Sequence, residues 1–309
     1  MISGFMIVKD VLKQGYPFVE AIASALPICD EFLLSDGCST DGTSEIVHRI
    51  SKLNKKIKIY RHKWPTVKNI SVLAEVTNAI RKKCKFDYIL SIQANEIIHE
   101  ESVEYIKALP EMRPEVYTFS FPYLQLLANY KWTEEFRLRF SKNMPGIIAI
   151  ADAWTLGASK SFIRLEEFKN LKNPRKLLRY IGTGIELTFA NSGKSPFSKP
   201  VYLPKPVFRY WSLFPRDFLE KCLKHAEMFD LPEFQDFVKI LKGHVDDPSS
   251  FWKLVSEMLR AQPVGLKYPE SLGCVNKNDH PALIQDFISD SHLKNYHVRD
   301  EVLDLIRRL

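Results

Sequence analysis

The stretch SDGCSTDGT (35–43) joins an apolar run to an amphipathic segment, and it has the most specific pattern in the chain. Asp36 stands where the apolar run ends, directly before Gly37. Glycine lets a ligand approach the backbone closely, and a short carboxylate accepts hydrogen bonds from a ribose hydroxyl or a base N–H. Asp41 follows at the start of a predicted helix, where free backbone N–H groups and the helix dipole favour an anion. A capped turn explains a lone Asp-Gly pair, but the whole string favours a nucleotide-binding turn.

The segments on either side of this string alternate between strand and helix patterns. Short apolar runs predict strands, and amphipathic spacing predicts helices between them. This order predicts an α/β fold with a mostly parallel, doubly wound sheet flanked by helices. Binding sites in such sheets lie at the carboxyl ends of the strands, which is where Asp36 stands. The predicted strands are 5–8, 31–35, 56–60 and 86–92, and the predicted helices are 17–26, 43–53 and 71–83.

The second half of the chain has a different pattern. Strand patterns over 116–121, 136–140 and 147–150 precede a basic, loop-like stretch. Helical patterns then follow over 216–228, 232–241, 249–259 and 299–309. We therefore expect a boundary near residue 212, with an α/β domain over 1–212 and a helical C-terminal extension over 213–309.

Composition narrows the class of protein. The 309 residues are 45% hydrophobic, and no apolar run reaches the roughly 18 residues that a membrane-spanning helix needs. The N-terminus lacks the basic start and apolar core of a signal peptide, so we expect a cytoplasmic protein. The five cysteines are odd in number and form no CxxC pair, which argues against a zinc site or a disulfide framework.

The net charge of +7 is unevenly distributed. Residues 160–209 contain eleven Lys and Arg against three Glu, so this segment holds the whole excess of positive charge. The segment is either a solvated basic surface or a basic surface that binds an anionic partner. That partner would be a diphosphate, a phosphorylated lipid carrier, an anionic glycan or a membrane surface. The last option predicts peripheral contact with an anionic membrane. Nucleic acid is not an expected partner, because no motif of a nucleic-acid-binding family accompanies the charge.

The 35–43 string resembles the DGSTDGT signature of family-2 glycosyltransferases of the GT-A fold. The resemblance covers about residues 3–212. It implies a GT-A fold that binds a nucleotide diphosphate sugar in a half over about 1–100, and an acceptor in a half over about 101–212. It also implies inversion at the anomeric carbon. Further stretches resemble one branch of the family in the same order: FMIVKD (5–10), PFVEAI (17–22), LPICDE (26–31), IQANEIIHE (92–100), RLR (137–139), DAW (152–154) and HP (280–281).

This resemblance assigns residues to the nucleotide, and two motifs depart from the family pattern. Asp36 would contact the base or ribose, and Lys9 and Asp10 would line the same pocket. Where the family has an acidic metal-binding motif, often QADE in this branch, the chain has QANE (93–96). Where the family has a histidine that completes the metal shell, the chain has Arg209.

The changed motifs alter the expected chemistry. Hard cations prefer anionic oxygen ligands, and Glu96 is the one charged residue of QANE, a weak candidate ligand for Mn²⁺ or Mg²⁺. Arginine cannot ligate a metal, but it can grip a phosphate with two parallel N–H donors. Gln93, Asn95 and Arg209 are therefore candidate contacts of the nucleotide sugar.

Two interpretations follow. In the one we favour, the enzyme works without a metal, and Arg209 with neighbouring basic residues neutralises the departing diphosphate. In the other, the chain has lost catalysis and keeps a surface that binds a nucleotide sugar or a glycan, for example inside a polysaccharide-assembly complex. Binding of a divalent cation through Glu96 and the diphosphate itself is a further alternative.

An inverting transfer needs a base that takes the proton of the acceptor hydroxyl as its oxygen attacks. Asp152 is the first candidate, because it follows the apolar run 147–151 and matches the family's DA position. A turn-capping role is the alternative for Asp152. Glu134 and Glu135 are further candidates, although either could pair with a nearby arginine instead. The expected acceptor is a glycan, a lipid carrier or a protein.

Overall fold

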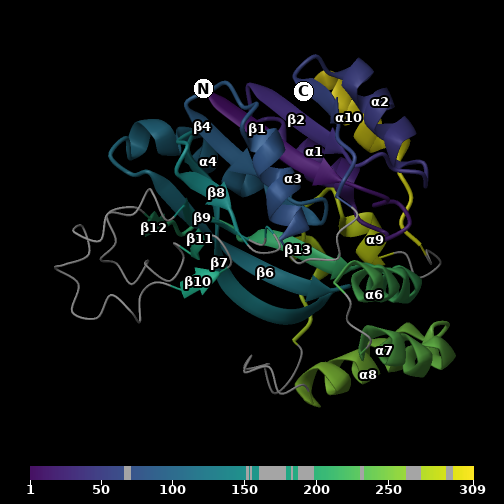
Figure 1. Ribbon diagram of the computed structural model, residues 1–309. Helices are drawn as coiled ribbons and strands as arrows, with labels where there is room; N and C mark the ends of the chain where they lie inside the picture. The colour runs from purple at the N-terminus through teal and green to yellow at the C-terminus, as the bar shows by residue number, and fades with distance from the viewer. Residues whose placement is uncertain are drawn as a thin grey trace, which may run out of the picture.

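The computed structural model folds the chain into two sheets with flanking helices (Figure 1). Within the described residues, the larger sheet has the order β3-β2-β1-β4-β7-β6-β13-β5, with β12 paired to β6. Its strands are β1 (Ile2–Val8), β2 (Glu31–Asp36), β3 (Ile57–Arg61), β4 (Tyr88–Ser91), β5 (Glu96–Ile98), β6 (Thr118–Leu127), β7 (Tyr130–Lys142), β12 (Ser198–Pro200) and β13 (Val207–Ser212). The described residues are 1–65, 71–150, 153, 155–159, 179–181, 184–186, 198–229, 233–261, 273–289 and 295–309.

The N-terminal part of the larger sheet is parallel. β3, β2, β1 and β4 all run in the same direction, as their alternation with helices predicts. β6 is also parallel to β12 and β13, whereas β7 is antiparallel to both of its neighbours. The predicted α/β fold with a mostly parallel sheet flanked by helices is confirmed.

Pairing extends some strands beyond their apolar runs. β6 and β7 form a long antiparallel hairpin that includes Gln125 and Thr133, although these residues are polar. β5 was not expected, because its three residues directly follow the polar QAN sequence. It exists because β13 pairs with it antiparallel, with Arg209 opposite Glu96. The smaller sheet is antiparallel and contains β8 (Ile147–Ala149), β9 (Leu156–Ser159), β10 (Arg179–Ile181) and β11 (Gly184–Glu186).

Helices cover both faces of the parallel strands, because alternate side chains of a strand point to opposite faces. Phe5 and Leu33 belong to the core under α3, whereas Met6 and Leu34 belong to the core under α1. The helices are α1 (Phe18–Ala25), α2 (Thr43–Leu53), α3 (Val72–Arg81), α4 (Glu100–Met112), α6 (Pro215–Phe229), α7 (Glu233–Leu241), α8 (Pro248–Ala261), α9 (Gln285–Ser289) and α10 (Asp300–Arg308).

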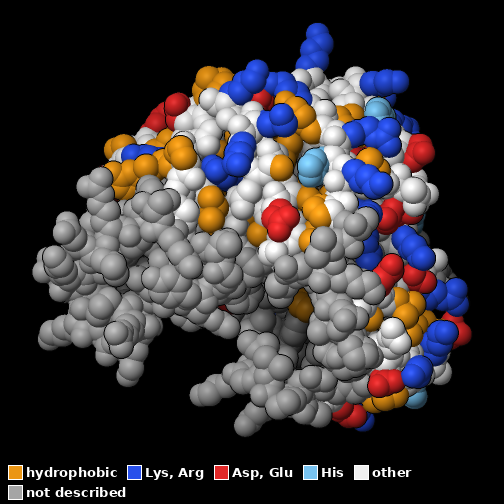
Figure 2. Space-filling model, in the orientation of Figure 1, with side chains coloured by type: hydrophobic (Ala, Val, Ile, Leu, Met, Phe, Trp, Pro, Cys, Tyr) orange, Lys and Arg blue, Asp and Glu red, His pale blue; other side chains and the backbone are white. Residues whose placement is uncertain are grey.

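The described surface mixes both signs of charge. On the face in Figure 2, Lys and Arg side chains lie among Asp and Glu side chains rather than in one patch. Much of the basic segment 160–209 lies outside the described residues, so its predicted contact with an anion or a membrane stays a prediction. Among the described helices, none is long and apolar enough to cross a membrane.

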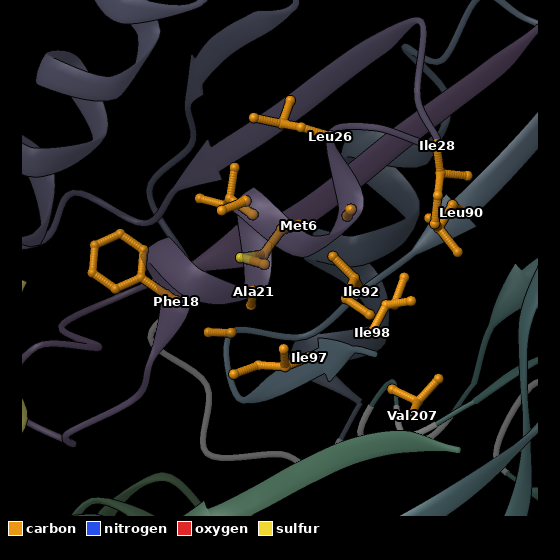
Figure 3. Close-up of a cluster of buried hydrophobic side chains, with 14 of the residues drawn as sticks. Met6, Phe18, Ala21, Leu26, Ile28, Leu90, Ile92, Ile97, Ile98 and Val207 are labelled. Carbon is orange, nitrogen blue, oxygen red and sulfur yellow. The ribbon is translucent and has the colours of Figure 1, made fainter. Parts of the chain in front are cut away.

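The main core lies between α1 and the strands it covers. Figure 3 shows Met6 of β1 beside Phe18 and Ala21 of α1, with Ile97 of β5 and Val207 of β13 closing the cluster. Side chains from four strands thus meet under one short helix. This packing fixes the carboxyl ends of β1 and β4 close to β5, and therefore fixes the turns that follow them.

The C-terminal helices divide into two groups. α6, α7 and α8 share a separate apolar cluster around Phe251. α10 instead packs on α1 and α2, and its residues Val302 and Ile306 belong to the main core. The Asn54 side chain donates a hydrogen bond to the Ile306 carbonyl at 2.8 Å. The domain boundary near residue 212 stays a prediction.

Two buried carboxyl groups join the C-terminal segment to the rest of the molecule. The Tyr296 hydroxyl donates to Glu20 of α1 at 2.8 Å, and the Tyr296 backbone N–H donates to Asp217 of α6 at 3.2 Å. Burial raises the pKa of each carboxyl to about 7. Both groups therefore favour the folded state when they are protonated.

The pKa of Asp217 predicts a loss of stability at alkaline pH. Because the folded-state pKa is raised from 3.8 to about 7, its contribution is fully present below about pH 4 and is lost as pH rises through 7. Asp217→Asn removes this loss, so we expect the variant to be more stable than the parent at pH 8, on the order of 2–4 kcal/mol, and similar near pH 4. Urea unfolding at both pH values measures this difference. An equal difference in unfolding free energy between variant and parent at the two pH values would contradict the prediction.

Candidate active site

Two polar clusters lie at the carboxyl ends of the parallel strands. The first, the Asp36 cluster, consists of Lys9, Asp10, Asp36, Gly37 and Trp64 with the loop residues that bond to them. The second, the Glu96 network, follows β4 and reaches across to β6, β7 and β13. Their positions fit the rule that sites of such sheets lie beyond the carboxyl ends of the strands.

Asp36 is fully buried at the end of β2. Its Oδ1 accepts hydrogen bonds from the Ser39 N–H at 3.0 Å and the Ser39 hydroxyl at 2.7 Å. Its Oδ2 has no hydrogen-bond partner among the described residues. A buried carboxylate oxygen without a donor is costly, so this atom is suited to accept from a bound hydroxyl or N–H.

Gly37 lies where two elements approach it closely. A Cβ at this position would lie 2.7 Å from the Trp64 Nε1 and 2.9 Å from the Lys9 Cβ. The Lys9 ammonium lies 5.7 Å from the centre of the Trp64 ring. The Trp64 Nε1–H is buried and has no acceptor among the described residues. The sequence prediction missed Trp64, although its place just after a predicted strand could have indicated it.

Asp10 and Asp41 tie the two loops of this cluster together. The Asp10 carboxylate accepts from the Thr40 N–H at 2.8 Å. Asp41 accepts from the Lys13 N–H at 2.8 Å through one oxygen and from the Thr43 N–H at 3.0 Å through the other. The loop after β1 is therefore fixed against the 36–43 turn. Direct contact of Asp10 or Asp41 with a nucleotide stays a prediction.

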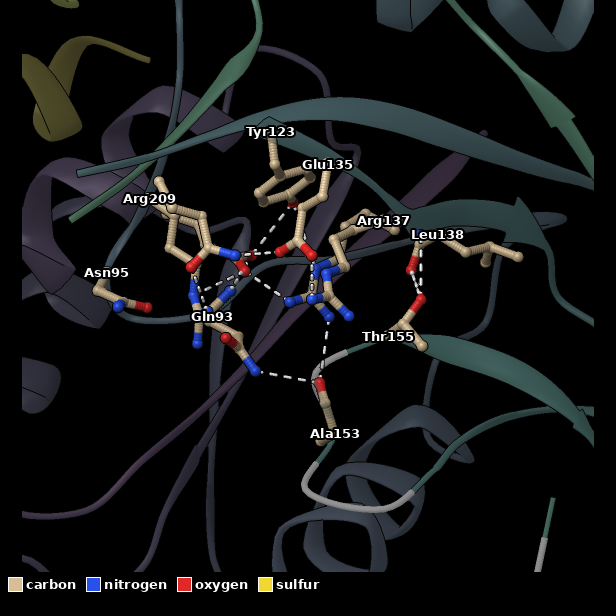
Figure 4. A network of polar contacts seen from close by, with 12 residues as sticks. Gln93, Asn95, Tyr123, Glu135, Arg137, Leu138, Ala153, Thr155 and Arg209 are labelled. Atoms are coloured by element: carbon tan, nitrogen blue, oxygen red, sulfur yellow. Dashed lines mark hydrogen bonds and ion pairs between the residues drawn. The ribbon is translucent and has the colours of Figure 1, made fainter. Parts of the chain in front are cut away.

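The Glu96 network contains a fully buried ion pair. Figure 4 shows its neighbours Gln93, Tyr123 and Arg209 gathered around it. Glu96 Oε1 lies 2.5 Å from Arg139 Nη2, and the two side chains are 0% and 2% exposed. Glu96 Oε2 accepts from the Gln93 N–H at 2.9 Å and from the Tyr123 hydroxyl at 3.3 Å. Burial alone would lower the pKa of Arg139, but the Glu96 carboxylate raises it above its usual value.

Arg209 lies at the edge of this network. Its Nη1 donates to the Gln125 side-chain carbonyl at 3.0 Å, and its Nε lies 3.8 Å from Glu96 Oε1. The Trp211 Nε1–H donates to the same Gln125 oxygen at 2.6 Å. The guanidinium also lies 5.6 Å from the centre of the Trp211 ring. The structure thus brings Arg209 and Glu96 together, which their separation in sequence could not indicate.

Gln93 and Asn95 hold neighbouring backbone. The Gln93 side chain donates to the Ala153 carbonyl at 3.0 Å, and Arg139 donates to the same oxygen at 3.1 Å. The buried Asn95 side chain donates to the Tyr210 carbonyl at 2.9 Å. Their predicted contacts with a nucleotide sugar stay predictions.

The structure describes two of the three candidate bases. Asp152 lies outside the described residues, although its neighbour Ala153 is anchored to the network by its carbonyl. Glu135 belongs to the network, because Gln125 and Arg137 both donate to its carboxylate. Glu134 is exposed and accepts from Lys131 at 2.7 Å. No catalytic role is tested for any of them.

The donor set around Glu96 does not fit a divalent cation. Both carboxylate oxygens already accept hydrogen bonds, and the guanidiniums of Arg139 and Arg209 lie beside them. A second cation at this point would meet repulsion from both. In the described part of the chain, no three His, Cys, Asp or Glu residues form a group that could hold a metal. Beside Glu96 the network carries the positive charges of Arg139 and Arg209.

Comparisons with known proteins give distant likenesses only. No protein-family model and no curated protein matches the chain. Residues 1–349 of S. aureus TarS are 12% identical, with 73% of this chain and 64% of that chain covered and a TM-score of 0.36. A longer TarS structure is 14% identical over 86% and 44%, with a TM-score of 0.35. The mannosyltransferase PcManGT of Pyrobaculum calidifontis, solved with GDP-Man and Mn²⁺, is 15% identical over 39% and 34%, with a TM-score of 0.31.

The chain therefore spans less than two thirds of each of these solved chains. At this distance no residue role passes from them to this chain.

The buried ion pair predicts strongly coupled effects of mutation. Arg139→Met leaves the Glu96 carboxylate buried beside Tyr123 without its main partner, so we expect a loss of about 3–5 kcal/mol in unfolding free energy. Glu96→Gln leaves the Arg139 guanidinium buried without its carboxylate, and the double variant removes both charges. We expect the double variant to be more stable than Arg139→Met. Urea unfolding of all four proteins measures the coupling, and additive losses would rule the ion pair out as the organising contact.

Proposed function

We propose that the chain is a family-2-like glycosyltransferase that moves a sugar from a nucleoside diphosphate sugar to an acceptor with inversion. The observation that carries the proposal is the Asp36 cluster. A buried carboxylate, one oxygen of which has no partner among the described residues, stands beside Gly37, whose lack of a Cβ lets Trp64 and Lys9 pack against the turn. This arrangement is suited to bind a nucleoside, with Asp36 Oδ2 accepting from a ribose hydroxyl or a base N–H.

The Glu96 network supplies the environment for the leaving diphosphate. Arg209 is held from two sides, by Gln125 and by Glu96, and its partly exposed guanidinium can donate in parallel to two phosphate oxygens. Glu96 then acts through the arginines rather than on the ligand. In this proposal the arginine takes the place of the metal in neutralising the charge that develops on the diphosphate.

The reaction follows from these roles. The acceptor hydroxyl oxygen attacks the anomeric carbon, and the bond from that carbon to the diphosphate oxygen breaks, with its electron pair leaving on the diphosphate. A carboxylate takes the hydroxyl proton. Asp152 is the first candidate for this base, with Glu135 second, because Glu135 already lies in the network. The acceptor is a glycan, a lipid-linked sugar or a protein, and the protein acts in the cytoplasm or at the membrane surface.

A panel of nucleotides tests the proposal. We expect one of UDP, GDP and dTDP to raise the melting temperature of the full chain, because a ligand that binds only the folded state stabilises it. Asp36→Asn places an amide donor at Oδ2, the oxygen without a partner among the described residues. The variant should therefore bind that nucleotide about tenfold or more weakly. Asp87→Asn, on an exposed side chain at the opposite end of the sheet, is the matched control and should bind as the parent does. If no nucleotide shifts the melting temperature, the proposed function fails.

The same panel separates the three interpretations of the site. Stabilisation that persists in EDTA supports neutralisation by arginine, whereas stabilisation that needs Mn²⁺ or Mg²⁺ assigns the role to a metal held by the diphosphate and Glu96. Binding without slow hydrolysis of the bound sugar donor supports a catalytically silent binding protein.

Carboxylate variants test the base. We expect Asp152→Asn to slow hydrolysis of the bound donor, in which water replaces the acceptor, by about 100-fold or more. Donor affinity should not change, because the base does not hold the nucleotide. Glu134→Gln and Glu135→Gln are measured beside it. Unchanged turnover in Asp152→Asn would remove Asp152 from the mechanism, and a loss confined to Glu135→Gln would transfer the role to Glu135.

A further inference from the structure

Helix α6 carries two lysines, Lys221 and Lys224, one turn apart on the face that meets both polar clusters. α6 lies beside the end of β13 (Figure 1). The Lys221 side chain is almost fully buried, with 2% exposed, and Lys224 is partly buried. Both belong to the region predicted as a helical extension, and neither was a predicted site residue.

Lys224 reaches the Asp36 cluster. Its ammonium donates to the backbone carbonyl of Lys9, at the carboxyl end of β1. Burial lowers the pKa of Lys224 to about 8, while the Asp10 and Asp41 carboxylates act in the opposite direction. Those two carboxylates already accept hydrogen bonds from the N–H groups of the loops. Lys224 is thus held in place over the cluster, and among the described residues no carboxylate lies within ion-pair distance of it, although those of Asp10 and Asp41 act on it from farther away.

Lys221 reaches the Glu96 network from the same helix. Its ammonium donates to the Trp211 carbonyl at 2.7 Å. It also lies 4.1 Å from the centre of the Trp211 ring and 5.3 Å from that of Tyr16. No carboxylate in the described part of the chain lies within ion-pair distance of it. Burial lowers its pKa well below the usual value, and the charge of Arg209 lowers it further.

Arg209, Lys221 and Lys224, here called the basic row, are related through the Trp211 ring and helix α6. The Arg209 guanidinium and the Lys221 ammonium both lie against the Trp211 ring. Lys224 continues the row to Lys9. A buried cation without a carboxylate partner carries an unrecovered desolvation cost, which a bound anion would offset. The row therefore joins the nucleoside end of the site to the reacting end.

We propose that Lys221 and Lys224, with Arg209, bind the diphosphate of the nucleotide sugar. The inference rests on the proposed function, and it names α6 as the source of the charge. Lysines three residues apart on a helix have Cβ atoms about 5–6 Å apart, so the partly buried Lys224 can meet a phosphate while the almost fully buried Lys221 acts on the same anion through its electrostatic potential. A lysine acts as a point charge and needs no fixed orientation of the phosphate. The helical segment is then part of the active site and not an appendage.

Binding measurements on variants of the full chain test this site. The probes are UDP, GDP and dTDP, the matching nucleosides, and inorganic pyrophosphate, each titrated by calorimetry. Lys221→Met and Lys224→Met keep most of the apolar stem and remove the charge. We expect each variant to bind the nucleoside diphosphate and pyrophosphate about tenfold or more weakly than the parent does. The affinity for the nucleoside should not change. Lys242→Met, on the exposed 3₁₀ turn Lys242–His244, is the control and should bind as the parent does. If Lys221→Met fails to fold, Lys224→Met decides the test.

The outcomes distinguish this inference from the proposed function. If the parent binds a nucleoside diphosphate and both variants bind it as the control does, the lysine site is wrong and the proposed function stands. Equal weakening of nucleoside and nucleoside diphosphate also overturns the site, because it indicates a loss of shape rather than of charge. If pyrophosphate binding depends on Lys224 but no nucleotide binds more tightly than pyrophosphate, the anion site stands and the proposed function falls. If no probe binds the parent, both fall.

Discussion

The buried contact between Glu96 and Arg139 is the constraint on which the rest of the site depends. Each charge is removed from water, so each is tolerable only while the other is present. The pair joins the turn after β4 to β7, and through the Ala153 carbonyl it also fixes the segment next to Asp152. Gln93 and Tyr123 donate to the Glu96 carboxylate, and Arg209 lies beside it. Arg139 already balances the charge of that carboxylate. The network is therefore held together by contacts within the protein itself.

If the proposed function holds, this arrangement differs in its charges from a diphosphate site that holds a metal. A site that holds a metal needs clustered carboxylates, and the free charge that it presents to the ligand is the metal's. Here the Glu96 carboxylate is paired with Arg139 inside the protein. The Arg209 and Lys224 side chains, by contrast, stay partly exposed. Arg209 comes from the end of β13, and the lysines come from α6, which directly follows it. The basic side chains thus come from the C-terminal part of the chain, while the Asp36 cluster is built from the N-terminal part.

Local sequence predicted the parallel half of the fold well. The apolar runs of β1, β2 and β4 are continuous because helices bury both faces of these strands, and that pattern can be read without a structure. The Asp36 turn was predicted for the same reason, since the strand end, Asp36 and Gly37 are adjacent in sequence. β5 was missed, because three residues after a polar motif form a strand only when β13 pairs with them. The extra length of β6 and β7 likewise depends on each other's hydrogen bonds.

The sequence by itself determined the order of strands and helices from β1 to β4, the turn that carries Asp36, and the loss of charge in the QANE motif. The tertiary structure alone decided what Glu96 does, because its partner Arg139 is 43 residues away and packs against it only when β7 lies beside β4. It alone also brought Trp64 to Gly37 and α6 to β13. The physical reason is the same in each case. Backbone pattern is local, but the neutralisation of a buried charge depends on which distant segments the core packs together.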